Sequence, residues 1–278
     1  MNIAIVGLGV IGGSFAMGLQ AAGYQNIYGI DINEETLLTA ETEGMIQKGF
    51  RDGKNILQEM DVIILSLYPS QIAPFVEQYQ SILKKGAVLT DVTGVKAAII
   101  EQVAEVLPRT VDFVFAHPMR GSEKKGIEGA DHKRFIGANV LVTPISSNKE
   151  TSLKMVEKLY KDIGFAQVTR VTPEKHDEQI AYVSQLMHAL SVAVTNSAQA
   201  SEETLIFAGN SFQELTRIAD INTELWSELF LNNRLALLKS IEQFERELNA
   251  LKKTLEENDE EKLRKIFNQA AQKRREWY

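Results

Sequence analysis

The chain has 278 residues and no cysteine, which excludes disulfide bonds, thiolate catalysis and cysteine-ligated metal within this sequence. Its net charge of -7 disfavours a nucleic acid partner, because a phosphate backbone binds to a basic surface. No apolar run approaches the roughly 20 residues that cross a bilayer, so we expect no membrane partner. The absence of cysteine fits a cytoplasmic location. Small-molecule chemistry remains as the expected function, and we predict no metal site.

The first part of the chain alternates short β-rich runs with amphipathic stretches, which is the pattern of a doubly wound α/β sheet. Strands are predicted at 2–6, 26–30, 61–66, 87–91, 112–116, 138–143 and near 166–171. Helices are predicted between them at 12–22, 33–43, 71–84, 95–106 and 150–163. Because the first strand begins at residue 2, we expect no signal peptide.

The pattern changes at Thr172, after which helical periodicity continues and no β-run follows. We therefore predict a Rossmann-type dinucleotide-binding domain over 1–172 and an all-α substrate and dimerisation domain over 173–278. A helical segment of about a hundred residues has little core of its own, which favours a homodimer interface over an intramolecular core. We expect the apolar stripe that would form this interface to lie on one long helix; it consists of Phe230, Leu237, Ile241, Phe244, Leu248, Leu251 and Leu255.

A dinucleotide fingerprint opens the chain, where the first strand runs into Gly7, Gly9 and Gly12, and Asp31 ends the second strand. The glycines allow a tight turn, a close approach of the backbone to a pyrophosphate, and close packing of helix on strand. The carboxylate accepts the ribose hydroxyls, and no arginine follows it to pair with a 2′-phosphate, so NAD is favoured over NADP. The predicted cofactor-binding residues are Gly7, Gly9, Val10, Ile11, Gly12, Asp31, Ser66 and Tyr68.

Candidate catalytic residues follow two further strands of the same sheet. His117 leaves the carboxyl end of its strand, where open α/β sheets bind ligands, and a histidine there is suited to accept a proton from a substrate hydroxyl. Thr93 and Gly94 follow a neighbouring strand, although such positions commonly cap the next helix. In the helical half, Arg217 either pairs with a carboxylate of the protein or binds an anionic substrate, and its spacing from other residues does not distinguish the two roles. His176 shows no sign of a function.

Five segments in a fixed order resemble the prephenate dehydrogenases: GLGVIGGS, DVTGVK, HPMRGSE, SQLMH and FQELTRIA, with Trp226 behind the last. The resemblance covers nearly the whole chain. It implies NAD-dependent oxidative decarboxylation of prephenate to 4-hydroxyphenylpyruvate in tyrosine biosynthesis, by a Rossmann domain joined to a helical dimerisation domain. Close relatives use arogenate instead, so an arogenate dehydrogenase is an alternative.

The resemblance also implies roles for individual residues. His117 is similar to the family's hydrogen-bond acceptor for the C4 hydroxyl of the substrate ring, and Arg217 is similar to its carboxylate-binding arginine. Glu123 and Glu214 match acidic residues that form an ionic gate with that arginine. His188 matches a pocket histidine near the substrate side chain.

Three sites depart from the family pattern. Residues 185–188 read Gln-Leu-Met-His where members often have His-Leu-Pro-His, Glu214 stands where they often have an aspartate, and the third site is Gly94. Gly94 stands where the family usually has a serine, whose hydroxyl helps to hold the C4 oxygen. Either Thr93 substitutes as a catalytic hydroxyl or that contact is missing. Because of these three departures, the choice between prephenate and arogenate stays open.

Two other function classes share parts of this pattern. A dehydrogenase of the β-hydroxyacid type would need a lysine on the first interdomain helix, and residues 176–196 contain none. A non-catalytic NAD-binding dimer is disfavoured by the joint presence of His117, Arg217 and Trp226.

Overall fold

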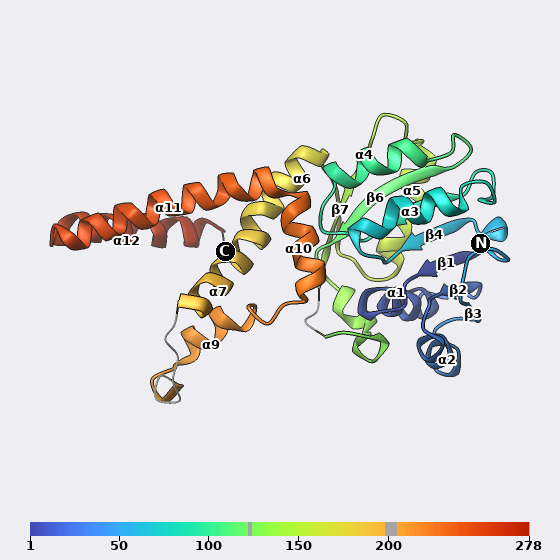
Figure 1. Cartoon of the computed structure of the whole chain (residues 1–278), viewed down its shortest axis with the longest axis horizontal. Helices are drawn as coiled ribbons and strands as arrows, with labels where there is room; N and C mark the ends of the chain where they lie inside the picture. The colour runs from blue at the N-terminus through green and yellow to red at the C-terminus, as the bar shows by residue number, and fades with distance from the viewer. Residues whose placement is uncertain (122–123, 198–204, 278) are drawn as a thin grey trace. The chain divides into compact units, whose positions relative to one another are not determined.

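The computed structural model describes residues 1–121, 124–197 and 205–277, which form two compact units, 1–233 and 234–278. The first unit contains one eight-stranded sheet with the strand order β3-β2-β1-β4-β5-β6-β7-β8 (Figure 1). Its strands are β1 Ile3–Val6, β2 Ile27–Ile30, β3 Lys48–Phe50, β4 Val62–Leu65, β5 Val88–Asp91, β6 Asp112–Pro118, β7 Asn139–Thr143 and β8 Gln167–Arg170.

Five helices connect the strands of this sheet: α1 Val10–Ala21, α2 Glu34–Thr42, α3 Pro69–Tyr79, α4 Ala97–Val106 and α5 Glu150–Asp162. Short 3₁₀ turns lie at Leu57–Glu59, Ile127–Gly129 and His132–Phe135. After the sheet come α6 Pro173–Ile180, a π-helical turn Ala181–Gln185, α7 Leu186–Ser197, α9 Asn210–Arg217 and α10 Thr223–Asn232. The second unit contains α11 Arg234–Glu256 and α12 Glu260–Trp277.

The core lies on both faces of the sheet because alternate residues of each strand point in opposite directions. In β1, Ile3 and Ile5 belong to one apolar cluster, which includes side chains of α1 and α5. Ala4 and Val6 belong to the other, which includes side chains of α3 and α4. Both faces are thus covered by helices (Figure 1), which confirms the predicted doubly wound α/β fold.

The structure adds two features that the sequence did not predict. The edge strand β3 pairs in parallel with β2, but its three residues, with Gly49 in the middle, are too short to show a β-type alternation. Strand β7 runs antiparallel to β6, whereas β8 is parallel to β7. Strand direction is set by the connections between strands, so hydrophobic periodicity contains no information about it.

The helical part begins where the sequence predicted it. Thr172 caps α6 by accepting a hydrogen bond from the Lys175 backbone N–H at 3.2 Å, and Pro173 occupies the first helical position. The division into compact units falls later, between Asn233 and Arg234. A domain boundary at Thr172 therefore stays a prediction.

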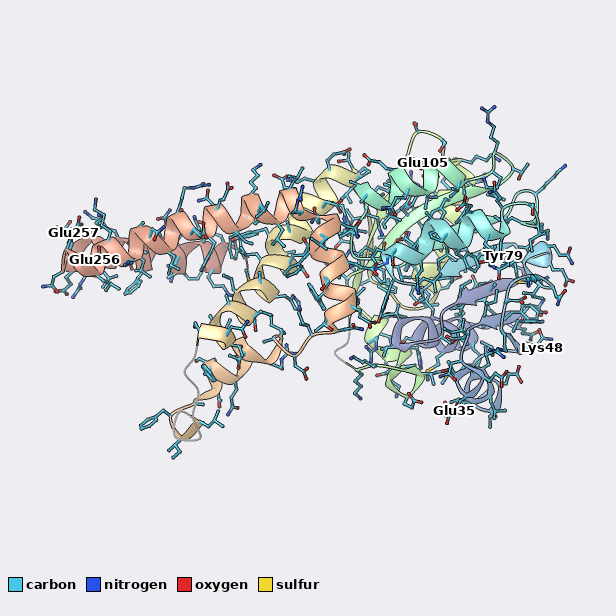
Figure 2. All side chains as sticks on the ribbon, viewed as in Figure 1. Glu35, Lys48, Tyr79, Glu105, Glu256 and Glu257 are labelled. Carbon is cyan, nitrogen blue, oxygen red and sulfur yellow. The ribbon has the colours of Figure 1, made fainter. Side chains whose placement is uncertain are left out.

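In the second unit, α11 and α12 contact each other as a helical hairpin, and Glu256 and Glu257 lie where α11 ends (Figure 2). Our interpretation of the apolar stripe as one helix is wrong for its first member, because Phe230 belongs to α10 and Asn233 interrupts the helix. Leu248 and Leu255 are exposed on α11. No helix in the described part of the chain combines the length and apolar character that a membrane crossing requires.

Candidate active site

The glycine loop between β1 and α1 has the close contacts that its sequence predicts. Gly7 has a φ of 83°, and a Cβ atom there would lie 2.4 Å from the Ser66 carbonyl oxygen. A Cβ atom on Gly12 would lie 1.8 Å from the Gly7 carbonyl oxygen. At Gly9, by contrast, the place of a Cβ atom has no described atom of another segment within 4 Å. Two glycines are therefore required by packing, whereas Gly9 leaves the surface of the loop open.

The N-terminal turn of α1 lies at this open surface. Gly9 is the N-cap and provides no side-chain hydrogen bond, and the first backbone bond of the helix runs from Gly13 N to Gly9 O at 2.8 Å. The N–H groups of Val10, Ile11 and Gly12 thus precede the helical ladder, where an anion is favoured by the helix dipole. This arrangement fits the pyrophosphate of a dinucleotide.

Asp31 is fixed at the end of β2 by two backbone donors. Its Oδ2 accepts from Leu8 N at 2.8 Å, and its Oδ1 accepts from Asn33 N at 2.9 Å. Each oxygen keeps a second lone pair, which a ribose hydroxyl can use. Arg51 follows β3, whose last residue Phe50 accepts a hydrogen bond from Asp31 N at 3.1 Å, and Arg51 is paired with Glu34 at 2.8 Å.

The loop after β4 adds the other wall of the cofactor region. Ser66 lies directly against the glycine loop, because its Cβ is 3.2 Å from the place of a Cβ on Gly12. The Tyr68 hydroxyl accepts a hydrogen bond from Asn222 Nδ2 at 2.8 Å. One residue past the start of α3, Ser70 donates from both its N and Oγ to Glu228, each at 2.8 Å. Helix α10 is therefore bonded to this loop.

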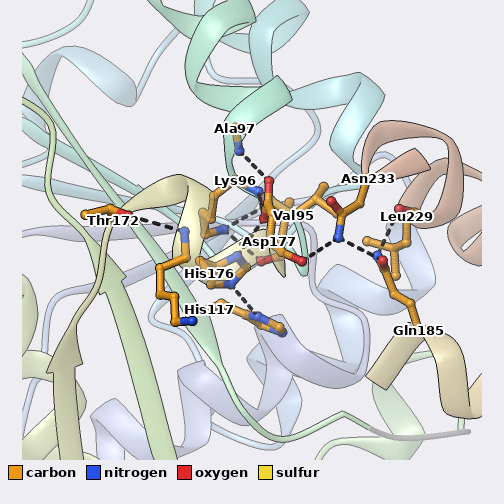
Figure 3. Close-up of polar contacts among 12 residues, drawn as sticks. Val95, Lys96, Ala97, His117, Thr172, His176, Asp177, Gln185, Leu229 and Asn233 are labelled. Carbon is orange, nitrogen blue, oxygen red and sulfur yellow. Dashed lines mark hydrogen bonds and ion pairs between the residues drawn. The ribbon is translucent and has the colours of Figure 1, made fainter. Parts of the chain in front are cut away.

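His117 lies at the carboxyl end of β6 and takes part in a chain of three ionisable side chains (Figure 3). Its Nδ1 is 2.9 Å from Nε2 of His176, and Nδ1 of His176 is 2.7 Å from Oδ1 of Asp177. A carboxylate only accepts hydrogen bonds, so His176 donates to Asp177. The His176 Nε2 is then an acceptor, and His117 donates to it from Nδ1.

The carboxylate at the end of this chain is held by backbone donors. Asp177 accepts from Lys96 N at 2.9 Å and from Ala97 N at 2.8 Å, one donor for each oxygen. Its carbonyl oxygen accepts from Asn233 Nδ2 at 2.9 Å. Asp177 thereby joins α6 to the first turn of α4 and keeps a fixed orientation toward His176.

Burial keeps both imidazoles neutral near pH 7. It lowers the pKa of His117 well below 6.5, and the neighbouring His176 and the Lys96 ammonium lower it further. Burial also lowers the pKa of His176, although the Asp177 carboxylate opposes that change. Neutral His117 with its proton on Nδ1 presents an unprotonated Nε2, which is the state that a general base requires.

Thr93 is buried in a separate cluster after β5. Its hydroxyl donates to Asp91 Oδ2 and accepts from Lys96 Nζ at 3.0 Å, while Lys96 Nζ also donates to Asp91 Oδ2 at 2.7 Å. The Lys96 and Asp91 side chains are both fully buried. Since its hydroxyl is already satisfied, Thr93 has the geometry of a residue that shapes the loop, and the structure offers no support for the catalytic role expected of it.

Gly94 lies between His117 and the helical half of the unit. A Cβ atom on Gly94 would be 3.7 Å from Cε1 and from Nε2 of His117, and 3.3 Å from Cδ2 of Leu229. The Nε2 edge of the imidazole therefore faces Gly94. Gln185 donates to the Leu229 carbonyl at 3.0 Å and so connects the π-helical turn to α10 (Figure 3).

The predicted substrate-binding residues are only partly brought together. His188 on α7 stacks on Trp226 with ring centroids 3.6 Å apart, and its Nδ1 donates to the Ser184 carbonyl at 3.0 Å. Arg217 and Glu214 both lie exposed on α9. Glu123 lies outside the described residues.

The sequence analysis missed His176 and Asp177, because they are 59 and 60 positions after His117 and only the fold brings them together. It also missed the buried Lys96, which stood in the DVTGVK motif. The available signal for the Lys96–Asp91 ion pair was an aspartate at the end of a strand with a lysine five positions later.

Comparisons with known proteins identify the family. Family models described as the nucleotide-binding domain and the dimerization domain of prephenate dehydrogenase match residues 15–170 and 172–269. The prephenate dehydrogenase of Lactococcus lactis is 30% identical over 96% of this chain and 75% of its own length.

Solved structures extend the match to three dimensions. The prephenate dehydrogenase from A. aeolicus, in complex with hydroxyphenyl propionate and NAD+, has a TM-score of 0.92 and 32% identity, covering 100% of this chain and 98% of its own. A Synechocystis arogenate dehydrogenase has a TM-score of 0.85 and 26% identity, covering 100% of both chains. Both family models and a relative at this identity confirm the resemblance, and the chain belongs to the prephenate dehydrogenase family.

Proposed function

We propose that this chain converts prephenate to 4-hydroxyphenylpyruvate and carbon dioxide with NAD as cofactor, in tyrosine biosynthesis. It is an NAD-dependent oxidoreductase of its family. The observation that carries the proposal is the chain of contacts from His117 through His176 to Asp177, which uses Nδ1 of His117 and turns its Nε2 toward Gly94, at the same sheet edge as the glycine loop.

The chemistry requires one base and alignment. Bound NAD supplies the hydride acceptor. As the C4 carbinol of prephenate becomes a carbonyl, its hydroxyl proton leaves, and His117 Nε2 accepts that proton. Loss of the ring carboxylate as carbon dioxide makes the ring aromatic, which drives the reaction. The protein therefore contributes mainly positioning and general-base catalysis.

Cofactor binding is assigned to the loop and strand ends described above. Gly9 and the N–H groups of Val10 and Ile11 would hold the pyrophosphate, and Asp31 would hold the ribose hydroxyls. The loop with Ser66 and Tyr68 would form a side wall of the cofactor site, next to Gly7 and Gly12.

Substrate binding is assigned to the helical half. Arg217 would bind a substrate carboxylate, with Glu214 and Glu123 as an ionic gate, and His188 would lie near the substrate side chain. Support comes from Ser191 Oγ, which donates to the Leu215 carbonyl at 2.7 Å and so bonds α9 to the α7 helix that contains His188. Gly94 would border the ring, because it lies beside His117 Nε2.

A homodimer in the cytoplasm completes the proposal. The match to a dimerization domain supports the dimer, as do exposed apolar side chains on α11 and α12: Leu235, Leu238, Leu248, Leu255, Phe267 and Trp277. Light scattering coupled to gel filtration tests it, and a monomer at micromolar concentration would contradict it.

Arogenate is the second candidate substrate, favoured by the similarity to the Synechocystis arogenate dehydrogenase. Rates of cofactor reduction should be measured with prephenate and with arogenate, each with NAD and with NADP. We expect the highest kcat/KM for prephenate with NAD. Faster turnover of arogenate would show that arogenate, and not prephenate, is the preferred substrate. Comparable rates with NADP would refute the role of Asp31.

A further inference from the structure

The orientation of His117 depends on residues that would not touch substrate. His117 Nδ1 is bonded to His176, whose ring is almost entirely inaccessible to solvent, and His176 is bonded to Asp177. An imidazole held through one nitrogen still has two neutral tautomers, and only one of them leaves Nε2 free to accept a proton. The residues that select the tautomer of His117 therefore affect whether His117 can act as a base.

Selection begins at Asp177. Each of its carboxylate oxygens accepts a backbone N–H, from Lys96 or from Ala97, and Oδ1 also faces His176 Nδ1. Two backbone donors from one helix start prevent the carboxylate from turning away. Because the Asp177 carboxylate can only accept hydrogen bonds, a neutral His176 must carry its proton on Nδ1, the atom that faces Oδ1.

We infer that Asp177, acting through His176, fixes the tautomer of His117 with the proton on Nδ1 and an unprotonated Nε2 on the Gly94 side. The two residues are positioning residues for the reaction that we propose above. The remaining charges near His117 agree with this order: Lys96 is a donor to Asp91, and it disfavours an imidazolium at His117.

The tautomer is measurable without substrate or NAD. The chain has four histidines, so a ¹⁵N–¹H correlation spectrum of the imidazole rings is assignable with single substitutions of His117, His132 and His188. We expect His117 to be neutral at pH 7.5, with a proton on Nδ1 and none on Nε2. A proton on Nε2 of His117 in the unmodified protein would overturn the inference.

Substitutions separate positioning from structure. His176→Phe removes the acceptor of His117 Nδ1, so kcat should fall by roughly 10²-fold, within the range of a misdirected general base, while KM stays within about 2-fold. His176→Gln provides a carbonyl oxygen near the place of Nε2 and should restore most of kcat. Equal kcat for His176→Phe and the unmodified protein would contradict the inference.

Asp177→Asn has a matched control. An amide at Asp177 places one donor against His176 or against a backbone N–H, so the tautomer at His117 should become mixed and kcat should fall. Asp112 is also buried and caps a helix, accepting from Lys149 N at 2.9 Å and from Asn148 Nδ2 at 2.6 Å. Asp112→Asn should cost similar thermal stability but leave the imidazole spectrum unchanged.

These results also distinguish this inference from the proposed function. An Nδ1-protonated His117 in a protein that fails to oxidise prephenate would refute the function and leave the tautomer assignment intact. Turnover of prephenate with unchanged His117 signals in Asp177→Asn and His176→Phe would refute the inference alone.

Discussion

Two glycines three positions apart should respond to alanine in opposite ways, because only one has room for a side chain. A Cβ on Gly12 would lie 1.8 Å from the Gly7 carbonyl oxygen and 3.0 Å from its carbon. Backbone atoms must therefore move by more than 1 Å. We expect Gly12→Ala to lower the free energy of unfolding by about 3 kcal/mol, which is the upper end of the usual cost of overpacking. For a unit of this size, that lowers Tm by roughly 6–12 °C.

Gly9→Ala should instead keep the stability of the fold and lose cofactor binding. Gly9 has a φ of -68°, which alanine adopts readily, and its Cβ would enter only open space. The expected change in unfolding free energy is below about 1 kcal/mol, the usual difference between glycine and alanine at an N-cap. The added methyl group, however, occupies the surface that a pyrophosphate would approach.

Thermal unfolding with and without NAD measures both effects. NAD at about 100 times its Kd should stabilise the unmodified protein by roughly 2.7 kcal/mol. Gly9→Ala should unfold near the unmodified Tm and show no NAD-dependent shift, whereas Gly12→Ala should unfold at a lower temperature. Gly209, an N-cap of α9 with equally open space, is the control, and its alanine variant should keep the NAD shift. A full NAD shift in Gly9→Ala, or an unchanged Tm in Gly12→Ala, would refute the reasoning.

Three further predictions concern the reaction and its pH dependence. His117→Asn should lower kcat by roughly 10²- to 10⁴-fold and keep the NAD-dependent Tm shift, which steady-state kinetics and thermal unfolding check. Arg217→Ala should mainly raise KM for prephenate, since a bound carboxylate is lost from ground and transition states alike; a fall in kcat at constant KM would contradict that role. Stability should decrease as the pH falls below about 6.5, because His117 and His176 have lowered pKa values when folded and take up protons on unfolding. The slope is at most about 1.4 kcal/mol per pH unit for each histidine. Denaturant unfolding from pH 7.5 to 5 measures it, and the His117→Gln, His176→Gln double variant should flatten it.

The parts of the fold that follow from local sequence were predictable. The glycine loop and Asp31 lie within one strand, turn and helix, and their roles depend on residues close to them in the chain. The central strands were also predictable, because a strand that is buried on both faces has a short, continuous apolar run in the sequence. The edge strand at 48–50 shows no such pattern, since it has only three residues and none of them is fully buried.

The site was predictable only in part, because much of it depends on contacts between distant segments. His117 was identifiable from its place at a strand end. His176 and Asp177 looked like the ordinary start of a helix, and their role depends on α6 lying beside α4. Thr93 was expected to be catalytic, yet its hydroxyl is satisfied by Asp91 and Lys96, which no spacing rule reveals.

A crystal structure of the protein with NAD and a phenolic analogue of the product would test the central claim most directly. The account predicts that the ring oxygen lies within hydrogen-bond distance, about 2.6–3.2 Å, of His117 Nε2, and that the ribose hydroxyls lie on Asp31. An imidazole turned away from the ring oxygen, with no water between them, would contradict the assignment of His117 as the base.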